Sequence, residues 1–178
     1  MKLNKIVLGI TLVFGIAAFS QAATDPTADL GHGTVTFTGS ITDAPCSINS
    51  GNIDQTVNLG QISKVELDNK GTSTPKEFKI NLEKCNVGEG KSVTAKFTGA
   101  EGSTAGLLGI IGTAKGASIV MEDGKGKIIQ LGKSTYAQKL QNGNNTFLFS
   151  AYLQGDGASG GIVPGDFSSV TNFTLDYQ

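Results

Sequence analysis

The feature that most constrains the fold of this sequence is an alternating apolar segment at its end. Phe173, Leu175 and Tyr177 are apolar, and polar residues lie between them. Alternation with a period of two is typical of a half-buried β-strand. A second alternating segment, residues 33–39, precedes Cys46 and has no hairpin partner beside it in the sequence. A strand that runs to the last residues and an extended segment without a partner together suggest strand exchange between chains.

Residues 1–22 have the pattern of a secretory signal peptide. Two lysines are followed by an apolar run over 6–19, and the small residues Ser20 and Ala22 complete a cleavage motif. An uncleaved membrane anchor is the alternative, but the apolar run is shorter than the roughly 20 residues that a spanning helix needs. We therefore expect cleavage before Ala23 and export of the mature chain.

The chain has two cysteines, Cys46 and Cys85, and one histidine. In an exported protein two cysteines favour pairing, because the compartment is oxidising. A metal site would need two or more further ligands, and a catalytic thiol would need an unpaired cysteine. Closing a loop of about 40 residues stabilises a fold by roughly 4 kcal/mol in the chain-entropy model. The sequence therefore predicts a structural disulfide and no metal site.

The charge balance argues against nucleic acid as a partner. Two of the 14 basic residues lie in the signal peptide, so the mature chain has 12 basic and 15 acidic residues and a net charge of −3. There is no arginine and no basic cluster that could neutralise a phosphate backbone.

Short alternating segments separated by turn signals predict an all-β fold in one domain. Asp123-Gly124 and Asn142-Gly143 are tight-turn dipeptides. About seven strands of this kind suggest an immunoglobulin-like sandwich, with at most one short helical turn at 135–140. The expected strands cover residues 40–48, 56–60, 78–85, 93–97, 118–121, 127–131, 147–153 and 167–177.

No catalytic constellation is present in the sequence. His32 lies in a glycine-rich segment without partner groups, so we expect an exposed side chain rather than a general base. The glycines between 102 and 112 predict a flexible loop, because no Gly-Lys-Ser/Thr follows them to bind phosphate. Glu122 and Asp123 are adjacent in a hairpin turn, where we expect both to be solvent-exposed. The sequence predicts no enzyme and no cofactor.

Several segments, in this order and around one disulfide, resemble the major pilin subunits of type 1-like fimbriae, which the chaperone–usher pathway assembles. The resemblance covers the whole mature chain and is closest to the MR/P-type fimbrial major subunits. Tyr177 is the penultimate residue and Gly165 is fourteenth from the end, as in the C-terminal signature of that family. The remaining matching segments are Gly33 to Gly39, Asp43 to Cys46, Gln55 to Gln61, Glu77 to Cys85, Asn142 to Asn145 and Val163 to Phe167.

The resemblance implies an immunoglobulin-like sandwich that lacks its last strand and is completed by donor-strand exchange. Residues 1–22 would be the signal peptide, 23–39 a donor-strand extension and 40–178 the pilin domain. The partners would be identical or homologous pilin subunits, a periplasmic chaperone and an outer-membrane usher. The product would be an adhesive surface fimbria, exported through the periplasm.

The resemblance also assigns roles to two groups of residues. The donor strand would present alternate residues to the groove of the next subunit, with Val35 and Phe37 as the main apolar contacts. The groove and chaperone-recognition strand would lie at the C-terminus, where the chaperone anchors the carboxylate of Gln178. The donor residues are Gly31, Gly33, Val35, Phe37 and Gly39, and the groove residues are Gly165, Phe173, Leu175, Tyr177 and Gln178.

Other interpretations remain open at this stage. An alternating segment such as 33–39 is ordinarily a strand of its own domain. The chain could be a minor adaptor subunit rather than the major rod subunit, or an unrelated secreted β-sandwich that binds a partner. A carbohydrate-binding tip adhesin is disfavoured, because such adhesins carry a separate lectin domain and this chain is about half their length.

Overall fold

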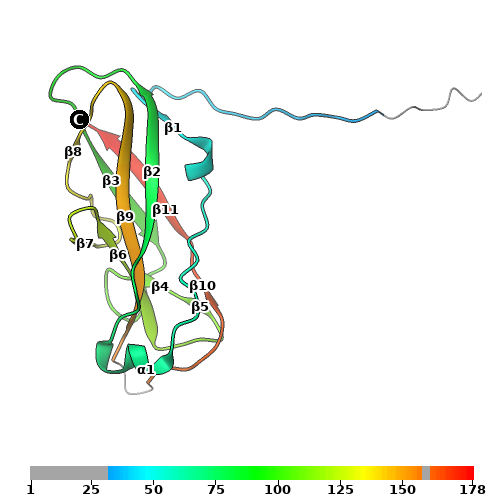
Figure 1. Cartoon of the computed structure of the whole chain (residues 1–178), viewed down its shortest axis with the longest axis vertical. Helices are drawn as coiled ribbons and strands as arrows, with labels where there is room; N and C mark the ends of the chain where they lie inside the picture. Colours follow the sequence, from blue (N-terminus) through cyan, green and yellow to red (C-terminus); the bar gives the residue numbers. More distant parts are fainter. Residues whose placement is uncertain (1–31, 158–160) are drawn as a thin grey trace, which may run out of the picture. The chain divides into compact units, whose positions relative to one another are not determined.

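The computed structural model of the chain describes residues 32–157 and 161–178 (Figure 1). The chain forms two units, Met1–Ser40 and Ile41–Gln178, each of which is described by itself. Within the first unit, the described residues 32–40 form neither helix nor strand. None of the helices in the described part of the chain is long and apolar enough to cross a membrane.

The second unit is an antiparallel β-sandwich. One sheet has the strand order β1-β2-β9-β6-β4, with β7 paired to β6, and the other has the order β11-β3-β8. A short additional pair joins β5 to β10. The strands are β1 Ser47–Ile48, β2 Lys76–Cys85, β3 Ser92–Gly99, β4 Leu108–Gly109, β5 Ile111–Gly112, β6 Ala117–Asp123, β7 Ile128–Ile129, β8 Gln138–Lys139, β9 Gly143–Gly155, β10 Phe167–Ser168 and β11 Thr171–Tyr177.

Three short helices lie in the connection between β1 and β2. They are η1 (Ser50–Asn52), α1 (Lys64–Leu67) and η2 (Asp68–Lys70). Asn49 caps η1, since its side chain accepts a hydrogen bond from the backbone N–H of Gly51 at 3.0 Å. These helices divide the connection and leave residues 54–62 between them without helix or strand.

Alternate residues of the long strands fill the space between the two sheets. A cluster of phenylalanines joins the layers: the ring of Phe149 lies 5.3 Å from Phe78 and 5.2 Å from Phe97. Aromatic pairs in such geometries add about 0.5–1.5 kcal/mol beyond the area they bury. The core is therefore built mainly from side chains of β2 and β9, which form the long ladder of one sheet, and of β3 in the other sheet.

The predicted disulfide between Cys46 and Cys85 is confirmed. Both cysteines are buried, and their Cα atoms are 4.1 Å apart. The bond joins the residue before β1 to the last residue of β2, and beside it the N–H of Asn86 donates to the carbonyl of Pro45 at 2.9 Å. The disulfide thus fixes the beginning of the sandwich to its central ladder.

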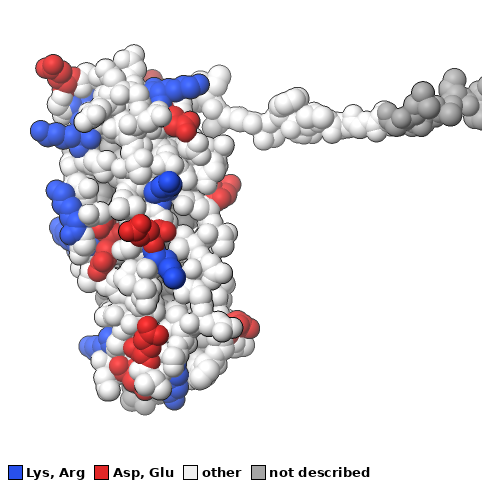
Figure 2. Space-filling view, viewed as in Figure 1, with Lys and Arg blue, Asp and Glu red and all other residues white. Residues whose placement is uncertain are grey.

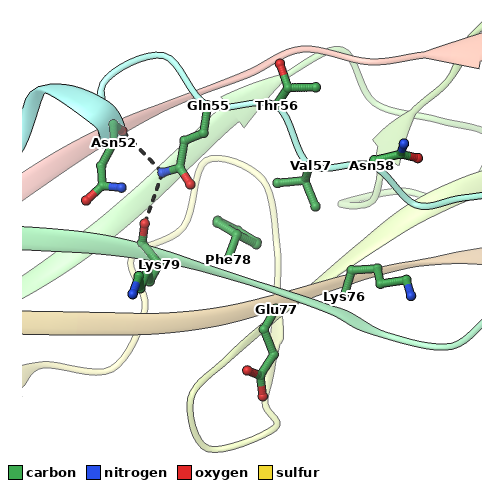
Figure 3. A pocket seen from close by; sticks show the side chains of 9 residues that line it. All are labelled: Asn52, Gln55, Thr56, Val57, Asn58, Lys76, Glu77, Phe78 and Lys79. Atoms are coloured by element: carbon green, nitrogen blue, oxygen red, sulfur yellow. Dashed lines mark hydrogen bonds between the residues drawn. The ribbon is translucent and has the colours of Figure 1, made fainter.

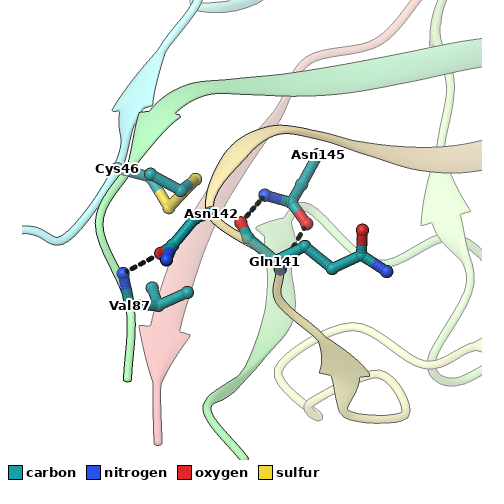
Figure 4. Close-up of a disulfide and its surroundings, with 6 residues drawn as sticks. Cys46, Val87, Gln141, Asn142 and Asn145 are labelled. Atoms are coloured by element: carbon teal, nitrogen blue, oxygen red, sulfur yellow. Dashed lines mark hydrogen bonds between the residues drawn. A yellow bond between two sulfur atoms is a disulfide. The ribbon is translucent and has the colours of Figure 1, made fainter. Parts of the chain in front are cut away.

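Side-chain amides support the loops next to the disulfide (Figure 4). The N–H of Val87 donates to Asn142 Oδ1 at 2.7 Å, which ties the loop after β2 to the bend before β9. Gln141 and Asn145 exchange two hydrogen bonds of 2.9 and 2.7 Å across that bend. Asn142 lies in a bend and Gly143 is the first residue of β9, and β8 and β9 lie in different sheets, so the tight hairpin turn expected at this dipeptide is not formed.

Four other expectations about local structure were wrong. Only Ser47–Ile48 of residues 40–48 forms a strand, and Pro45, which has no N–H to donate, directly precedes the cysteine. Residues 56–60 pair with no described strand, although their alternation is real: Val57 and Leu59 are half-buried and their neighbours are exposed. Residues 135–140 contain β8 rather than a helical turn, and 127–131 contributes only Ile128–Ile129.

Removing the disulfide should destabilise the domain without changing its fold. Replacing both cysteines by serine opens the loop between them, whose ends are 39 residues apart in sequence. The chain-entropy model gives a loss of about 4 kcal/mol in the free energy of unfolding for a loop of this length. Urea unfolding of the mature chain should show this loss as a lower midpoint with an unchanged slope. An unchanged midpoint would show that the bond does not constrain the unfolded chain.

Candidate functional site

The strand β11 lies at an edge of the sandwich with one side unpaired. Within the described residues it pairs with β3 alone, in unbroken register from Thr171↔Gly99 to Tyr177↔Val93. Beyond the ladder, Ser92 and Gln178 exchange two backbone hydrogen bonds of 3.0 and 2.8 Å. The strand is therefore held firmly along one side up to the last residue.

The register shows which backbone groups of β11 point away from β3. In an antiparallel ladder, hydrogen-bonded and non-hydrogen-bonded pairs alternate. Because Gln178 is in a hydrogen-bonded pair, even-numbered residues of β11 bond to β3 and odd-numbered residues point to the free edge. Phe97 agrees, because its carbonyl accepts from Gly132 on the other side of β3 at 2.7 Å. The N–H and C=O groups of Phe173, Leu175 and Tyr177 are thus available to another strand.

The same three side chains face the core but are only half-buried. Their opposite residues on β3, Val93, Ala95 and Phe97, are at most 1% exposed, whereas every apolar residue of β11 has intermediate burial. Half-burial raises the pKa of the Tyr177 phenol, because burial disfavours the charged form. The core is therefore closed over β3 and open over β11.

Residues 54–62 supply the second border of this open region. They run down the side of the sandwich that also carries β10 and β11 (Figure 1). Leu59 and Ile62 are half-buried and pack against the same core cluster as Phe173, Leu175 and Tyr177.

A hollow of about 400 Å³ lies beside these residues, between 55–58 and the edge of β2. In it, Val57 and Phe78 point toward one another (Figure 3). Phe78 is half-buried as well and belongs to the phenylalanine cluster. We call the whole region the open seam; it consists of Val57, Leu59, Ile62, Phe78, Phe173, Leu175 and Tyr177.

The edge of β2 near this hollow differs from the edge of β11 in its charge. On the side of β2 that faces away from β9, β1 pairs only with Leu82 and Glu83, so Lys76 to Lys79 have no strand on that side among the described residues. Three of these four residues are charged and exposed, a pattern that discourages further strand pairing. On β11 the outward residues are Asn172, Thr174 and Asp176. Of the two edges, that of β11 is the better suited to take a strand.

Glu122 and Asp123 have structural roles in the region of the hairpin turn after β6. His32 is exposed. Asp123 is buried, contrary to expectation, because its carboxylate closes the hairpin turn by accepting from the N–H groups of Lys125 and Lys127 at 2.9 and 3.0 Å. Glu122 is half-buried, also contrary to expectation, and accepts from the Tyr152 hydroxyl at 2.9 Å. Burial, together with this bond, raises the pKa of Tyr152 to about 12.

The glycine-rich stretch is also more ordered than expected. It forms a bonded turn, in which the N–H of Gly102 donates to the carbonyl of Leu107 at 2.9 Å, and Gly109 and Gly112 lie in β4 and β5. No cluster of three or more His, Cys, Asp or Glu side chains that could bind a metal occurs in residues 32–157 and 161–178.

Charge on the face that carries β2 and β9 is mixed. Acidic and basic side chains lie interspersed across it (Figure 2). Such a face is typical of a solvated surface rather than of a surface that binds phosphate.

Comparison with known proteins decides between the remaining classes. Residues 35–178 match the family model described as "Fimbrial protein", which covers the sandwich and the end of the first unit. The chain belongs to this fimbrial protein family.

Two curated relatives align with this pilin over the whole length of both chains. The Fimbria A protein of Serratia marcescens is 54% identical and the Major MR/P fimbria protein of Proteus mirabilis is 49% identical. A solved structure of a chaperone–usher pilus has a TM-score of 0.75 at 34% identity, over 86% of this chain and 99% of that one. The P pilus rod subunit PapA has a TM-score of 0.68 at 31% identity, over 76% of this chain and all of that one.

These similarities confirm the immunoglobulin-like pilin fold and the resemblance to MR/P-type major subunits. The protein is a structural pilin, and the relatives agree with a major rod subunit. Its homologues are structural fimbrial proteins, which confirms that it is not an enzyme. Pilins of this family polymerise with other pilin subunits and are assembled as fimbriae on the cell surface.

The described donor residues, Gly33, Val35, Phe37 and Gly39, belong to the first unit and not to the sandwich. Val35 and Phe37 are 74% and 89% exposed, and a Cβ added to Gly33 or Gly39 would touch nothing within 4 Å. Gly31 lies outside the described residues. These observations describe a segment whose apolar side chains are not covered by the described residues.

Gly165 is not part of β11. It lies before β10, where a Cβ would stand 2.4 Å from Thr113 Oγ1 and 2.7 Å from the N of Ala114. Close backbone packing is therefore a sufficient reason for glycine here. The residues that the sequence analysis missed are Val57, Leu59, Ile62 and Phe78, whose alternation was visible but was interpreted as an ordinary strand.

The register of β11 predicts a two-residue alternation in amide hydrogen exchange. In the isolated mature pilin, the amides of Phe173, Leu175 and Tyr177 should exchange near the unprotected rate, whereas those of Thr174 and Asp176 should be protected by β3. Residue-resolved exchange by NMR measures both sets. Equal protection of both sets would mean that the outer edge of β11 is already paired.

Proposed function

We propose that this pilin polymerises by donor-strand complementation, in which the extension of one subunit fills the open seam of the next. The observation that carries the proposal is β11, which has a free backbone edge and apolar side chains that are only half-buried. A strand beside β11 would pair with its free backbone edge through main-chain hydrogen bonds, and would cover its half-buried side chains with alternate side chains that enter the core.

The extension has the chemistry that the open seam requires. Residues 33–39 alternate so that Val35 and Phe37 share one face with Gly33 and Gly39, and both apolar side chains are exposed. Burying a valine or phenylalanine side chain fully contributes about 1.5–3 kcal/mol each. The segment of seven residues also matches β11, Thr171–Tyr177, in length. Glycines at both ends allow close approach of the two backbones.

The geometry of such a contact produces a filament. The donor strand and the open seam are different surfaces of one chain. Each subunit therefore inserts its donor strand into one neighbour and receives the donor strand of another neighbour in its open seam. A heterologous contact of this kind does not close unless the rotation between subunits forms a ring. The extension, residues 23–39, and the pilin domain, 40–178, would therefore be the two functional parts of the mature chain.

The subunit needs protection before it is assembled. An open apolar seam next to an unpaired strand edge is an aggregation hazard. We infer that, after cleavage of residues 1–22, a periplasmic chaperone covers the seam and binds the carboxylate of Gln178 through charge-assisted hydrogen bonds. An outer-membrane usher would then exchange the chaperone for the next extension on the route to the cell surface.

Phe37→Asp should abolish polymerisation and leave the fold of the subunit intact. The variant would place a carboxylate in the apolar seam of the neighbouring subunit, at a cost of several kcal/mol. Its own seam is unchanged, so it should still co-purify with the chaperone. Sheared surface filaments, separated without boiling and quantified as ladders of polymer, give the measurement.

Thr36→Asp provides the matched control. It adds the same charge to the same segment, but on the opposite face of the alternating strand. Filaments should form in this variant at close to the normal level. Normal polymer from Phe37→Asp, or equal loss from both variants, would refute the assigned role of the Phe37 face.

A further inference from the structure

The segment that borders the open seam is not held by a backbone ladder. Before residues 54–62, the chain pairs with the edge of β2 only through β1, in the two register pairs Ser47↔Glu83 and Ile48↔Leu82. One further backbone bond follows, from the N–H of Asn49 to the carbonyl of Asn81 at 3.0 Å. After it the chain turns into η1, and its backbone leaves the edge of β2.

Two side-chain amides continue the bonding where the backbone stops. The N–H of Asn81 donates to Asn52 Oδ1 at 2.8 Å, so a side chain replaces the carbonyl of a strand neighbour. Gln55 Nε2 then donates to the carbonyl of Lys79 at 3.1 Å and to the carbonyl of Asn52 at 3.2 Å (Figure 3). Asn81 and Lys79 are successive edge-facing residues of β2. The side chains therefore follow the hydrogen-bonding order of a ladder without bringing the main chain against β2.

Gln55 lies directly before the apolar border. Val57 comes two residues later and points toward Phe78 across the hollow. Among the described residues, the other hydrogen bond within 54–62 is local, from the N–H of Gly60 to Asn58 Oδ1 at 2.8 Å. Gln55 is thus the polar attachment of this border to the sheet, and packing of Leu59 and Ile62 supplies the rest.

We propose that Gln55 is a positioning residue for donor-strand binding, which holds residues 54–60 at the distance from β2 that keeps the seam open and shaped for the incoming strand. The inference rests on the proposed function and assigns it a residue that does not itself touch the donor strand. Loss of the attachment frees residues 54–60 from β2, so the segment can move over the seam, and the free subunit must reopen the seam before a strand enters. Binding then weakens although β11 and the donor strand are unaltered.

The test uses the mature chain with Phe37→Asp, which retains its own seam and does not polymerise, and a fluorescent synthetic peptide of residues 23–39. Gln55→Glu removes the donor of both hydrogen bonds at nearly constant size. Peptide affinity, measured by fluorescence anisotropy, should fall about fivefold, as expected for two solvent-exposed hydrogen bonds. Gln61→Glu is the matched control, because Gln61 is exposed on the same segment and its side chain makes no hydrogen bond to the described residues. It should bind as the parent does.

A second measurement separates positioning from a general loss of stability. With a Val35→Ala peptide, the penalty of Gln55→Glu should be smaller than with the unaltered peptide, because a correctly placed border matters most to a full-sized side chain. A purely structural role would give the same ratio for both peptides. Gln55→Met, which lacks the donor without adding charge, should reproduce the loss.

The outcomes distinguish this inference from the function on which it rests. Absence of any binding of the unaltered peptide to the Phe37→Asp chain would overturn both. Normal binding with equal affinities for Gln55→Glu and Gln61→Glu would overturn the role of Gln55 alone. Failure of both Gln55 variants to fold would make Gln55 part of the fold rather than a positioning residue, and would also overturn it.

Discussion

One feature governs the rest of the structure: the edge of β11 is unpaired, and the core beside it is incompletely covered. Three residues of β11 direct backbone N–H and C=O groups away from their ladder, and their side chains lie half-exposed over a phenylalanine cluster. Buried polar backbone groups need partners and apolar surface favours burial, so the same missing strand accounts for both deficits. A catalytic site is not needed to explain any part of the chain. What the domain requires is a strand from elsewhere.

A sandwich with a missing strand must obtain its stability from the rest of the fold. Here the ladders β2–β9 and β6–β9 form a continuous centre, and the disulfide attaches the start of the domain to the end of β2. The exposed part of the β2 edge carries charged residues, which discourages the wrong strand from pairing there. The domain is therefore closed at one edge by charge and left open at the other, and the difference directs assembly to β11.

Much of this could be predicted from the sequence, and the failures have physical causes. Strand 78–85 alternates clearly because its core-facing residues are buried and most of the others are not. In 147–153 the core-facing residues Phe147, Phe149, Ala151 and Leu153 also alternate, but Tyr152 is buried in a second cluster with Leu107 and Val120. Two cysteines in an exported chain leave little choice of pairing. Residues 56–60 alternate equally well, yet alternation reports which side chains are buried and not whether the backbone is paired. The hydrogen bonds of Asn52 and Gln55 to β2 join residues 24 or more apart in sequence. No local pattern could indicate them. Likewise, the burial of Asp123 depends on the closed hairpin and not on the acidic character of its neighbours.

The central claim is that residues 33–39 of one subunit complete the sandwich of the next. A density map of the assembled filament at side-chain resolution tests it most directly. The account predicts a continuous strand of residues 33–39 from one subunit between β11 and residues 54–62 of its neighbour, with the side chain of Phe37 inside the neighbour's core. A map in which residues 33–39 pair within their own subunit, or in which subunits meet elsewhere and the seam stays empty, would contradict it.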